Sequence, residues 1–193
     1  GFDRSFDGPD ICGKDAPKTW LGVYDHLFLG EVAKRIEAEN FDQPEFHFVY
    51  TTSNHGPYLL PFKEYGFDID RLMPEMPEAL RRDEKNWRRM AGAWYADQAA
   101  IHFIDKMKGL YPDSLFIVTG DHAAPVLPLD FDIVPRHEPN LRERFLTSFA
   151  MSHPELSQDM FSQNNIGCHM NILPTLMELI APKDFCYYSI LPS

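Results

Sequence analysis

Apolar positions repeat every four residues between residues 26 and 40. Phe28, Val32 and Ile36 are the repeating positions, and on a helix they would lie along one face. Asp25 stands immediately before this stretch, where a carboxylate can accept a hydrogen bond from an unpaired N–H of the first turn. The pattern predicts an amphipathic helix that Asp25 caps and that buries its apolar face.

A longer pattern of the same kind runs from residue 84 to residue 108. Its apolar positions are three, four or seven residues apart: Trp87, Met90, Trp94, Ile101 and Ile104. Asp97 lies on this otherwise apolar face, and it would need a hydrogen-bonding partner if it were buried. Tyr111 and Pro112 end the predicted helix.

Three further runs have the composition of strands, and a last apolar stretch has that of a helix. Residues 44–52 and 114–120 are rich in aromatic and β-branched residues, and residues 144–152 form a third candidate strand. Residues 169–181 predict a helix that begins or kinks at Pro174. Strand, long helix and strand in this order predict an α/β fold with a mostly parallel sheet, covered by helices on both faces.

The polar segments that follow two of these strands are candidates for a functional site. Residues 53–82 are too long for a plain connection, and residues 121–144 contain four prolines. In parallel sheets, ligands bind beyond the carboxyl ends of the strands. Both segments begin at such an end, so the sequence places a candidate site there.

Charge excludes one class of partner. The chain of 193 residues has 29 Asp and Glu against 18 Lys and Arg, a formal net charge of −11. Nucleic-acid binding needs a basic patch to neutralise phosphates, so we expect no nucleic-acid partner. No run approaches the roughly 18 consecutive apolar residues of a membrane span. The three cysteines are far apart and form no CxxC pair, which argues against a zinc knuckle or a disulfide framework.

Asp121 and His122 are the first candidates for chemistry. They follow a predicted strand directly, and neighbouring side chains can converge only where a strand has ended. Gly120 permits the change of direction because it has no Cβ. One carboxylate oxygen and one imidazole nitrogen suit Mn²⁺ or Zn²⁺ better than Ca²⁺, with further ligands from elsewhere. The same residues also fit a capping Asp beside a partly buried His.

His55 is the second candidate, in the sequence Ser-Asn-His-Gly-Pro-Tyr that follows the first predicted strand. Hydroxyl and amide groups precede it, and a Gly-Pro turn follows it. A histidine in this place can donate a hydrogen bond to a phosphoryl or sulfuryl oxygen as negative charge develops there. A loop histidine without a ligand is the other interpretation.

Five segments occur in a characteristic order along the chain. They are TWLGVYD (19–25), FHFVYTTSNHGPYLLP (46–61), WYADQAAIHFIDKMK (94–108), DSLFIVTGDHA (113–123) and HMNILPTLMELI (169–180). This series resembles the sulfatase-domain proteins of the alkaline phosphatase superfamily. SNHGPY makes it most similar to the branch of lipoteichoic acid synthases and phosphoglycerol transferases. The resemblance implies a three-layer α/β/α sandwich of the alkaline phosphatase type.

The resemblance also implies roles for single residues. Asp121 and His122 match the Asp-His pair that ligates the catalytic divalent metal in this family. That metal is usually Mn²⁺ in this branch, with Zn²⁺, Mg²⁺ and Ca²⁺ as the other ions considered. His55, with Asn54 beside it, matches the histidine that contacts the phosphate or sulfate group of the substrate. Asn171 stands where relatives carry Asp, which argues against a charged role there.

In such proteins the nucleophile, a threonine or a modified cysteine, and an acidic metal ligand lie upstream of the matched region. The resemblance therefore implies that residues 1–193 are the C-terminal portion of a sulfatase-like catalytic domain, with no second domain. The nucleophile would then be absent from this chain, and the chain alone would be inactive.

The function implied is part of a metal-dependent enzyme that acts on small phosphate or sulfate esters. A phosphoglycerol transferase or a sulfatase-like hydrolase fits best, with a phospholipid head group among the candidate substrates. The alternative is a non-catalytic binding or sensing domain that keeps the fold and has lost the nucleophile. The resemblance further implies a membrane-anchored parent protein whose catalytic domain lies on the extracellular or periplasmic face of the cell envelope.

Overall fold

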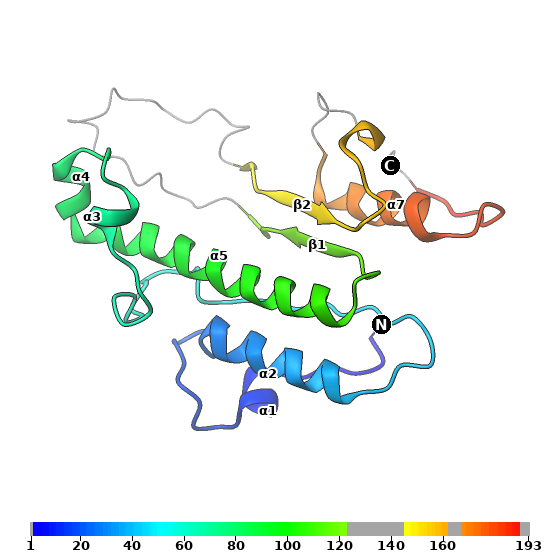
Figure 1. Cartoon of the computed structure of the whole chain (residues 1–193), viewed down its shortest axis with the longest axis horizontal. Helices are drawn as coiled ribbons and strands as arrows, with labels where there is room; N and C mark the ends of the chain where they lie inside the picture. Colours follow the sequence, from blue (N-terminus) through cyan, green and yellow to red (C-terminus); the bar gives the residue numbers. More distant parts are fainter. Residues whose placement is uncertain (1, 123–144, 162–166, 190–193) are drawn as a thin grey trace. The chain divides into compact units, whose positions relative to one another are not determined.

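The computed structural model describes residues 2–122, 145–161 and 167–189, and Figure 1 shows its helices and strands. The chain forms two compact units, Gly1–Pro154 and Glu155–Ser193. The elements of the first unit are α1 (Gly8–Cys12), α2 (Asp25–Ala38), α3 (Ile69–Leu72), α4 (Glu78–Arg82), α5 (Glu84–Leu110), β1 (Phe116–Thr119) and β2 (Phe149–Ser152). The second unit contains the 3₁₀ turn η1 (Gln158–Met160) and α7 (His169–Ile180).

The helices α2 and α5 lie side by side and carry much of the core of the first unit (Figure 1). Met107 of α5 packs with Val32, Ala33 and Ile36 of α2, and all four are buried. Burial of the valine, isoleucine and methionine side chains is worth roughly 1.5–3 kcal/mol each, and burial of the alanine methyl group is worth less. Both long helices predicted from the apolar spacing are confirmed, because the repeat in each matches the turn of a helix.

The face that α5 buries agrees with the predicted one in part. Trp87, Met90 and Trp94 are partly buried and pack against the core cluster, as predicted. Ala91, Tyr95 and Ala99 are its buried apolar positions in the middle of the helix, four residues apart. Ile101 is 43% exposed, and Asp97 is exposed and so needs no buried partner.

A second core cluster covers the first half of α5. Leu60, Phe62 and Phe67 come from the long connection between α2 and α5 and pack against Ala91 and Tyr95. Residues 53–82 of this connection were predicted to be too long for a plain connection, and they contain the short helices α3 and α4. The connection is therefore part of the core.

The described sheet consists of two antiparallel strands. β1 pairs with β2 so that Phe116 lies opposite Ser152 and Thr119 opposite Phe149. This arrangement differs from the mostly parallel sheet that the sequence predicts. Residues 44–52, predicted as a strand, form no ladder, and Phe46 and Phe48 are 69% and 67% exposed. A strand needs a neighbour for its backbone N–H and C=O groups, and the described residues provide none for this stretch.

The second unit is built on α7, which begins at His169 and continues through the buried Pro174. Its N-cap residue is Cys168, whose backbone N–H donates to the side chain of Asn171 at 2.8 Å. Asn171 therefore has a local role at the start of the helix. None of the helices in the described residues is both long and apolar enough to span a membrane.

Substitutions at two glycines of α5 test how the chain between α2 and α5 packs on this helix. A Cβ at Gly92 would lie 2.6 Å from Cδ1 of Tyr58, whereas a Cβ at Gly109 would meet nothing within 4 Å. We expect Gly92→Ala to lower the free energy of unfolding by about 1–2 kcal/mol, because Tyr58 must move away from the helix. Gly109→Ala should raise it by about 0.5–1 kcal/mol, because alanine favours the helical state. Urea denaturation of both variants is the measurement, and changes of the same sign would contradict the packing of Tyr58 on α5.

Candidate functional site

Asp121 lies just beyond the end of β1, separated from it by Gly120. A Cβ at Gly120 would overlap the side chain of Thr147, so only glycine fits here without a shift. The Oδ2 atom of Asp121 accepts a hydrogen bond from the Tyr50 hydroxyl at 3.0 Å, and Oδ1 accepts one from the His122 amide at 2.9 Å. The end of the strand thus presents a carboxylate held by two donors.

The surroundings of Asp121 favour its ionised form. Loss of solvent raises the pKa of this carboxyl group, but the hydrogen bonds from Tyr50 and from the His122 amide, together with the charge of His122, outweigh that effect. The pKa of Asp121 therefore lies below its usual value, while the pKa of Tyr50 is raised by its hydrogen bond to the carboxylate. An ionised carboxylate is what a divalent metal ion requires.

The side chains of Asp121 and His122 end close together and in solvent. Nε2 of His122 lies 3.6 Å from Oδ2 of Asp121, and the two side chains are 65% and 55% exposed. An oxygen and an imidazole nitrogen at this spacing fit two ligands of one metal ion. Within the described residues, no third His, Cys, Asp or Glu completes a metal-binding group.

His55 is exposed, and its ring is oriented by the next residue along the chain. Nδ1 of His55 lies 2.8 Å from the carbonyl oxygen of Gly56. A carbonyl oxygen can only accept, so Nδ1 carries a hydrogen and Nε2 is left for an incoming group. When protonated, Nε2 can donate to an oxygen of a phosphate or sulfate group.

Trp20 is the neighbour of His55 that sequence reasoning missed. Its indole Nε1 donates to the carbonyl oxygen of Gly56 at 3.0 Å, and its ring lies edge-on to the His55 ring at 5.3 Å between centroids. Trp20 is 69% exposed. The TWLGVYD segment contains no chemical signal that would have identified this contact, because it depends on residues more than thirty positions apart.

Residues 50–55 connect the pair of Asp121 and His122 with His55. Tyr50 bonds Asp121, and His55 follows five residues later. Among the described residues no hydrogen bond joins His55 to Asp121 directly. Asn54 is exposed, and its Oδ1 lies 3.6 Å from the position of a Cβ on Gly92, so its amide points toward α5.

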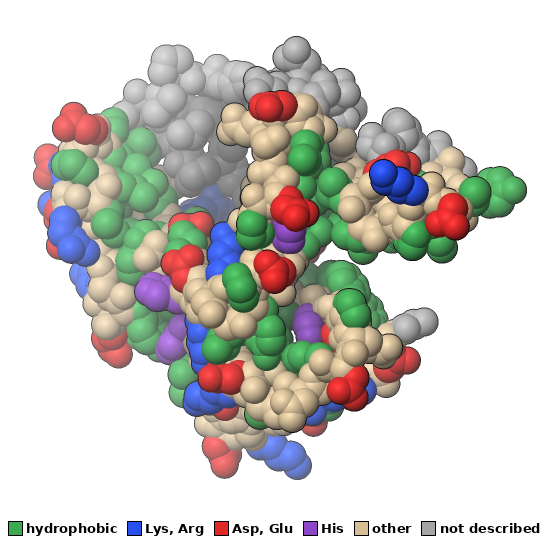
Figure 2. All heavy atoms as spheres, turned by 45° about the vertical axis from the view of Figure 1, so that its right-hand side comes forward, with side chains coloured by type: hydrophobic (Ala, Val, Ile, Leu, Met, Phe, Trp, Pro, Cys, Tyr) green, Lys and Arg blue, Asp and Glu red, His purple; other side chains and the backbone are tan. Residues whose placement is uncertain are grey.

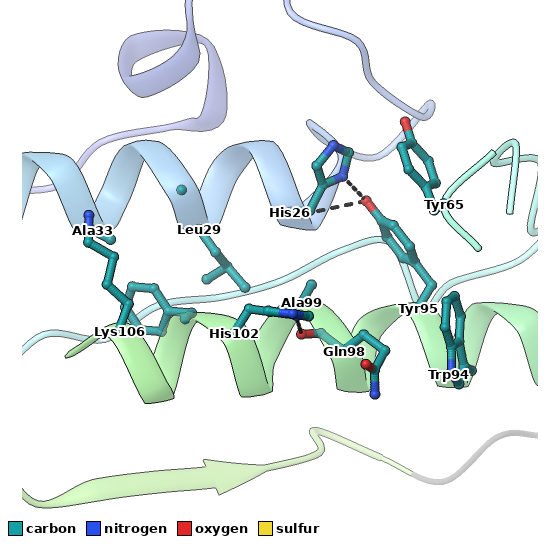
Figure 3. A pocket seen from close by; sticks show the side chains of 12 residues that line it. His26, Leu29, Ala33, Tyr65, Trp94, Tyr95, Gln98, Ala99, His102 and Lys106 are labelled. Atoms are coloured by element: carbon teal, nitrogen blue, oxygen red, sulfur yellow. Dashed lines mark hydrogen bonds between the residues drawn. The ribbon is translucent and has the colours of Figure 1, made fainter. Parts of the chain in front are cut away.

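A separate groove of about 360 Å³ lies between α2 and α5 (Figure 3). Leu29 and Ala33 of α2 and Ala99 of α5 line it, and none of the predicted site residues does. At one end Nδ1 of His26 approaches the hydroxyl of Tyr95 to 2.5 Å. Loss of solvent lowers the pKa of His26, opposed in part by the charge of Asp25.

Acidic side chains are dispersed over the face shown in Figure 2, among basic and hydrophobic ones. The acidic side chains on this face form no single patch. The charge of the chain does not by itself locate the site.

A sequence profile described as Sulfatase matches residues 1–181. The chain belongs to the sulfatase family. Its alkaline phosphatase-like α/β fold follows from that membership, and the resemblance drawn from the ordered segments is confirmed.

Two curated relatives of this sulfatase-family chain come from Bacillus subtilis (strain 168). The protein named lipoteichoic acid synthase-like YvgJ is 33% identical over 124 residues, which are 63% of this chain and 18% of the relative. Lipoteichoic acid synthase 1 is 27% identical over 124 residues, with the same coverage. The chain thus matches less than a fifth of the length of these relatives. No solved structure matches it significantly.

His26 gives the stability of the chain a dependence on pH. Its pKa is lower in the folded chain than in the unfolded chain, so the unfolded state binds protons more readily. The free energy of unfolding should therefore be highest above the ordinary histidine pKa of about 6.5, and it should fall as the pH drops below that value. Urea denaturation at about pH 7.5 and about pH 5.5 measures the loss, which should be smaller in His26→Gln. An equal loss in the variant would contradict this assignment.

Proposed function

We propose that this sulfatase-family chain is part of a metal-dependent enzyme that acts on phosphate or sulfate esters. The observation that carries the proposal is the position of Asp121 and His122, whose side chains end 3.6 Å apart just beyond β1 with the carboxylate favoured in its ionised form. The names of the two relatives support phosphoglycerol transfer over sulfate-ester hydrolysis. The candidate substrates are small phosphate esters, including a phospholipid head group.

Each residue has a distinct part in this proposal. Asp121 and His122 would hold the divalent ion. Their oxygen and nitrogen donors suit Mn²⁺ or Zn²⁺ better than Ca²⁺, and the resemblance to the lipoteichoic acid synthase branch favours Mn²⁺, with Zn²⁺, Mg²⁺ and Ca²⁺ as the alternatives. The ion, when bound, would supply positive charge that stabilises the ester oxygens and lowers the pKa of an attacking hydroxyl. Nε2 of His55 would donate a hydrogen bond to a non-bridging oxygen, and Asn54 would lie beside that substrate group.

We also propose that the nucleophile and the remaining metal ligand belong to parts of the protein that this chain does not contain. The short match to the relatives supports this, as does the exposure of the aromatic residues at 46, 48 and 50. Exposed aromatic side chains at alternate positions of an extended segment are expected where the layer that would cover that face is missing. The complete domain would then be the three-layer sandwich with a mostly parallel sheet, in a membrane-anchored protein facing the outside of the cell.

Substitution of the two candidate groups should separate metal binding from substrate contact. In the full-length protein, Asp121→Ala should lower the turnover of a nitrophenyl phosphodiester by at least about 10³-fold, because the metal loses an anionic ligand. His55→Ala should lower turnover by about 10²–10³-fold with the metal content unchanged. Turnover and metal content by mass spectrometry are the measurements.

Asp113→Ala is the matched control, since Asp113 is exposed and lies just before β1. It should leave both turnover and metal content unchanged. Wild-type rates in Asp121→Ala would remove Asp121 from the site. Loss of metal in His55→Ala would mean that His55 is a ligand and not a substrate contact.

The purified 193-residue chain should not turn over nitrophenyl phosphate or nitrophenyl sulfate, because it lacks the proposed nucleophile. It should bind Mn²⁺ weakly, and Asp121→Ala should abolish this binding in a calorimetric titration. Turnover by the chain that survives controls for contaminants would overturn the proposed division of the site. A full-length protein with neither a nucleophile nor an acidic ligand would instead favour a non-catalytic binding or sensing domain.

A further inference from the structure

The carboxylate of Asp25 is buried in an unusual way. Asp25 is 1% exposed, and in the described part of the chain it forms no ion pair. A buried carboxylate without a counter-charge is costly unless hydrogen-bond donors replace the lost water. Asp25 is the first residue of α2, where the helix dipole favours a negative charge. The rest of the compensation has to come from outside the helix.

Two backbone amides supply it. Oδ1 of Asp25 accepts hydrogen bonds from the backbone N–H groups of Thr52 and Ser53, both at 3.0 Å. In return, the Ser53 hydroxyl oxygen accepts a hydrogen bond from the backbone N–H of Asp25 at 3.0 Å, and Ser53 is fully buried. The sequence predicted that Asp25 caps its own helix, and this prediction is wrong: the N-cap is Tyr24, and the Asp25 side chain bonds Thr52 and Ser53 instead. Asp25 joins the start of α2 to the residues that lead to His55.

Residues 19–25, which end at Asp25, contact the chain around His55 at two further points. A Cβ at Gly22 would come within 2.5 Å of Oγ1 of Thr52, so the two backbones approach closely there. On the other side of His55, the Trp20 indole donates to the carbonyl oxygen of Gly56 at 3.0 Å. Residues 19–25 thus contact the chain both before and after His55.

We propose that Asp25 is a positioning residue that fixes the backbone from which the His55 ring reaches the substrate. This inference rests on the proposed function, since it takes His55 to be the substrate contact. Asp25 touches neither substrate nor metal, and it acts through the amides of Thr52 and Ser53. Its other oxygen, Oδ2, is buried without a hydrogen-bond partner among the described residues, so Oδ1 alone makes this connection.

Hydrogen exchange in the 193-residue chain tests the connection without any activity. In Asp25→Ala, the amides of Thr52 and Ser53 should exchange about tenfold faster or more, because each loses a charged acceptor. Asp25→Asn keeps an acceptor oxygen and should restore most of the protection. Asp83→Ala is the matched control: it removes the N-cap bond to the Asn86 amide of α5, at 2.8 Å, and should leave Thr52 and Ser53 protected.

Kinetics of the full-length protein test the consequence for His55. Asp25→Ala should lower kcat about tenfold with the metal content unchanged, and Asp25→Asn should recover most of the rate. In a His55→Ala background, adding Asp25→Ala should cause no further loss, because a residue that acts through His55 has nothing left to position. Ser53→Ala removes only one of the three bonds and should shift both readouts in the same direction by less, which keeps the test open if Asp25→Ala fails to fold.

Three results would overturn the proposal, and they are distinguishable. Unchanged exchange at Thr52 and Ser53 in Asp25→Ala would refute the connection itself. Additive losses in the double variant would refute action through His55. Faster exchange combined with unchanged turnover in both Asp25→Ala and His55→Ala would overturn the substrate role of His55, and with it the catalytic consequence of Asp25, while the structural connection would stand.

Discussion

A buried carboxylate must find donors, and in this chain that requirement determines where the His55 turn lies. Asp25 is placed at the start of α2 by the packing of that helix on α5, and its buried Oδ1 atom then accepts hydrogen bonds from the amides of Thr52 and Ser53. These amides lie just before His55. The packing of α2 on α5 therefore fixes Asp25, and through it the backbone that carries the exposed imidazole of His55.

The candidate metal pair is held by a different device. Asp121 and His122 extend from the end of a strand, where Gly120 allows close contact with Thr147. The pair is connected to the rest of the unit by the hydroxyl of Tyr50. Since Tyr50 and His55 belong to one continuous segment, a displacement of that segment would affect the orientation of the carboxylate and of the imidazole together. The two candidate groups are therefore mechanically linked although no hydrogen bond joins them directly within the described residues.

The parts of the fold that were predictable are those that depend on local periodicity. The spacing of Val32 and Ile36 predicted α2, and the apolar spacing between residues 84 and 108 predicted α5, because a helix satisfies its backbone internally. Residues 44–52 have strand composition but form no strand. Composition could not reveal this, because a strand also needs a neighbouring strand that pairs with its backbone, and that neighbour is not adjacent in the sequence. The buried face of α5 was predicted in part: Trp87, Met90 and Trp94 pack against the core, whereas Ile101 is exposed. The buried alanines were not predicted, because alanine is also frequent on exposed helix faces.

By itself, the sequence determined the family, through the order of its segments and its match over residues 1–181. It also identified Asp121, His122 and His55 as candidates, from their residue types and their positions after strand-like runs. Only the tertiary structure decided what surrounds them. Tyr50 beside Asp121, Trp20 beside His55 and Asp25 beneath the His55 turn are contacts between residues about 27 to 71 positions apart. Such contacts follow from packing and from the need to satisfy buried polar groups, and no local pattern of residues records them.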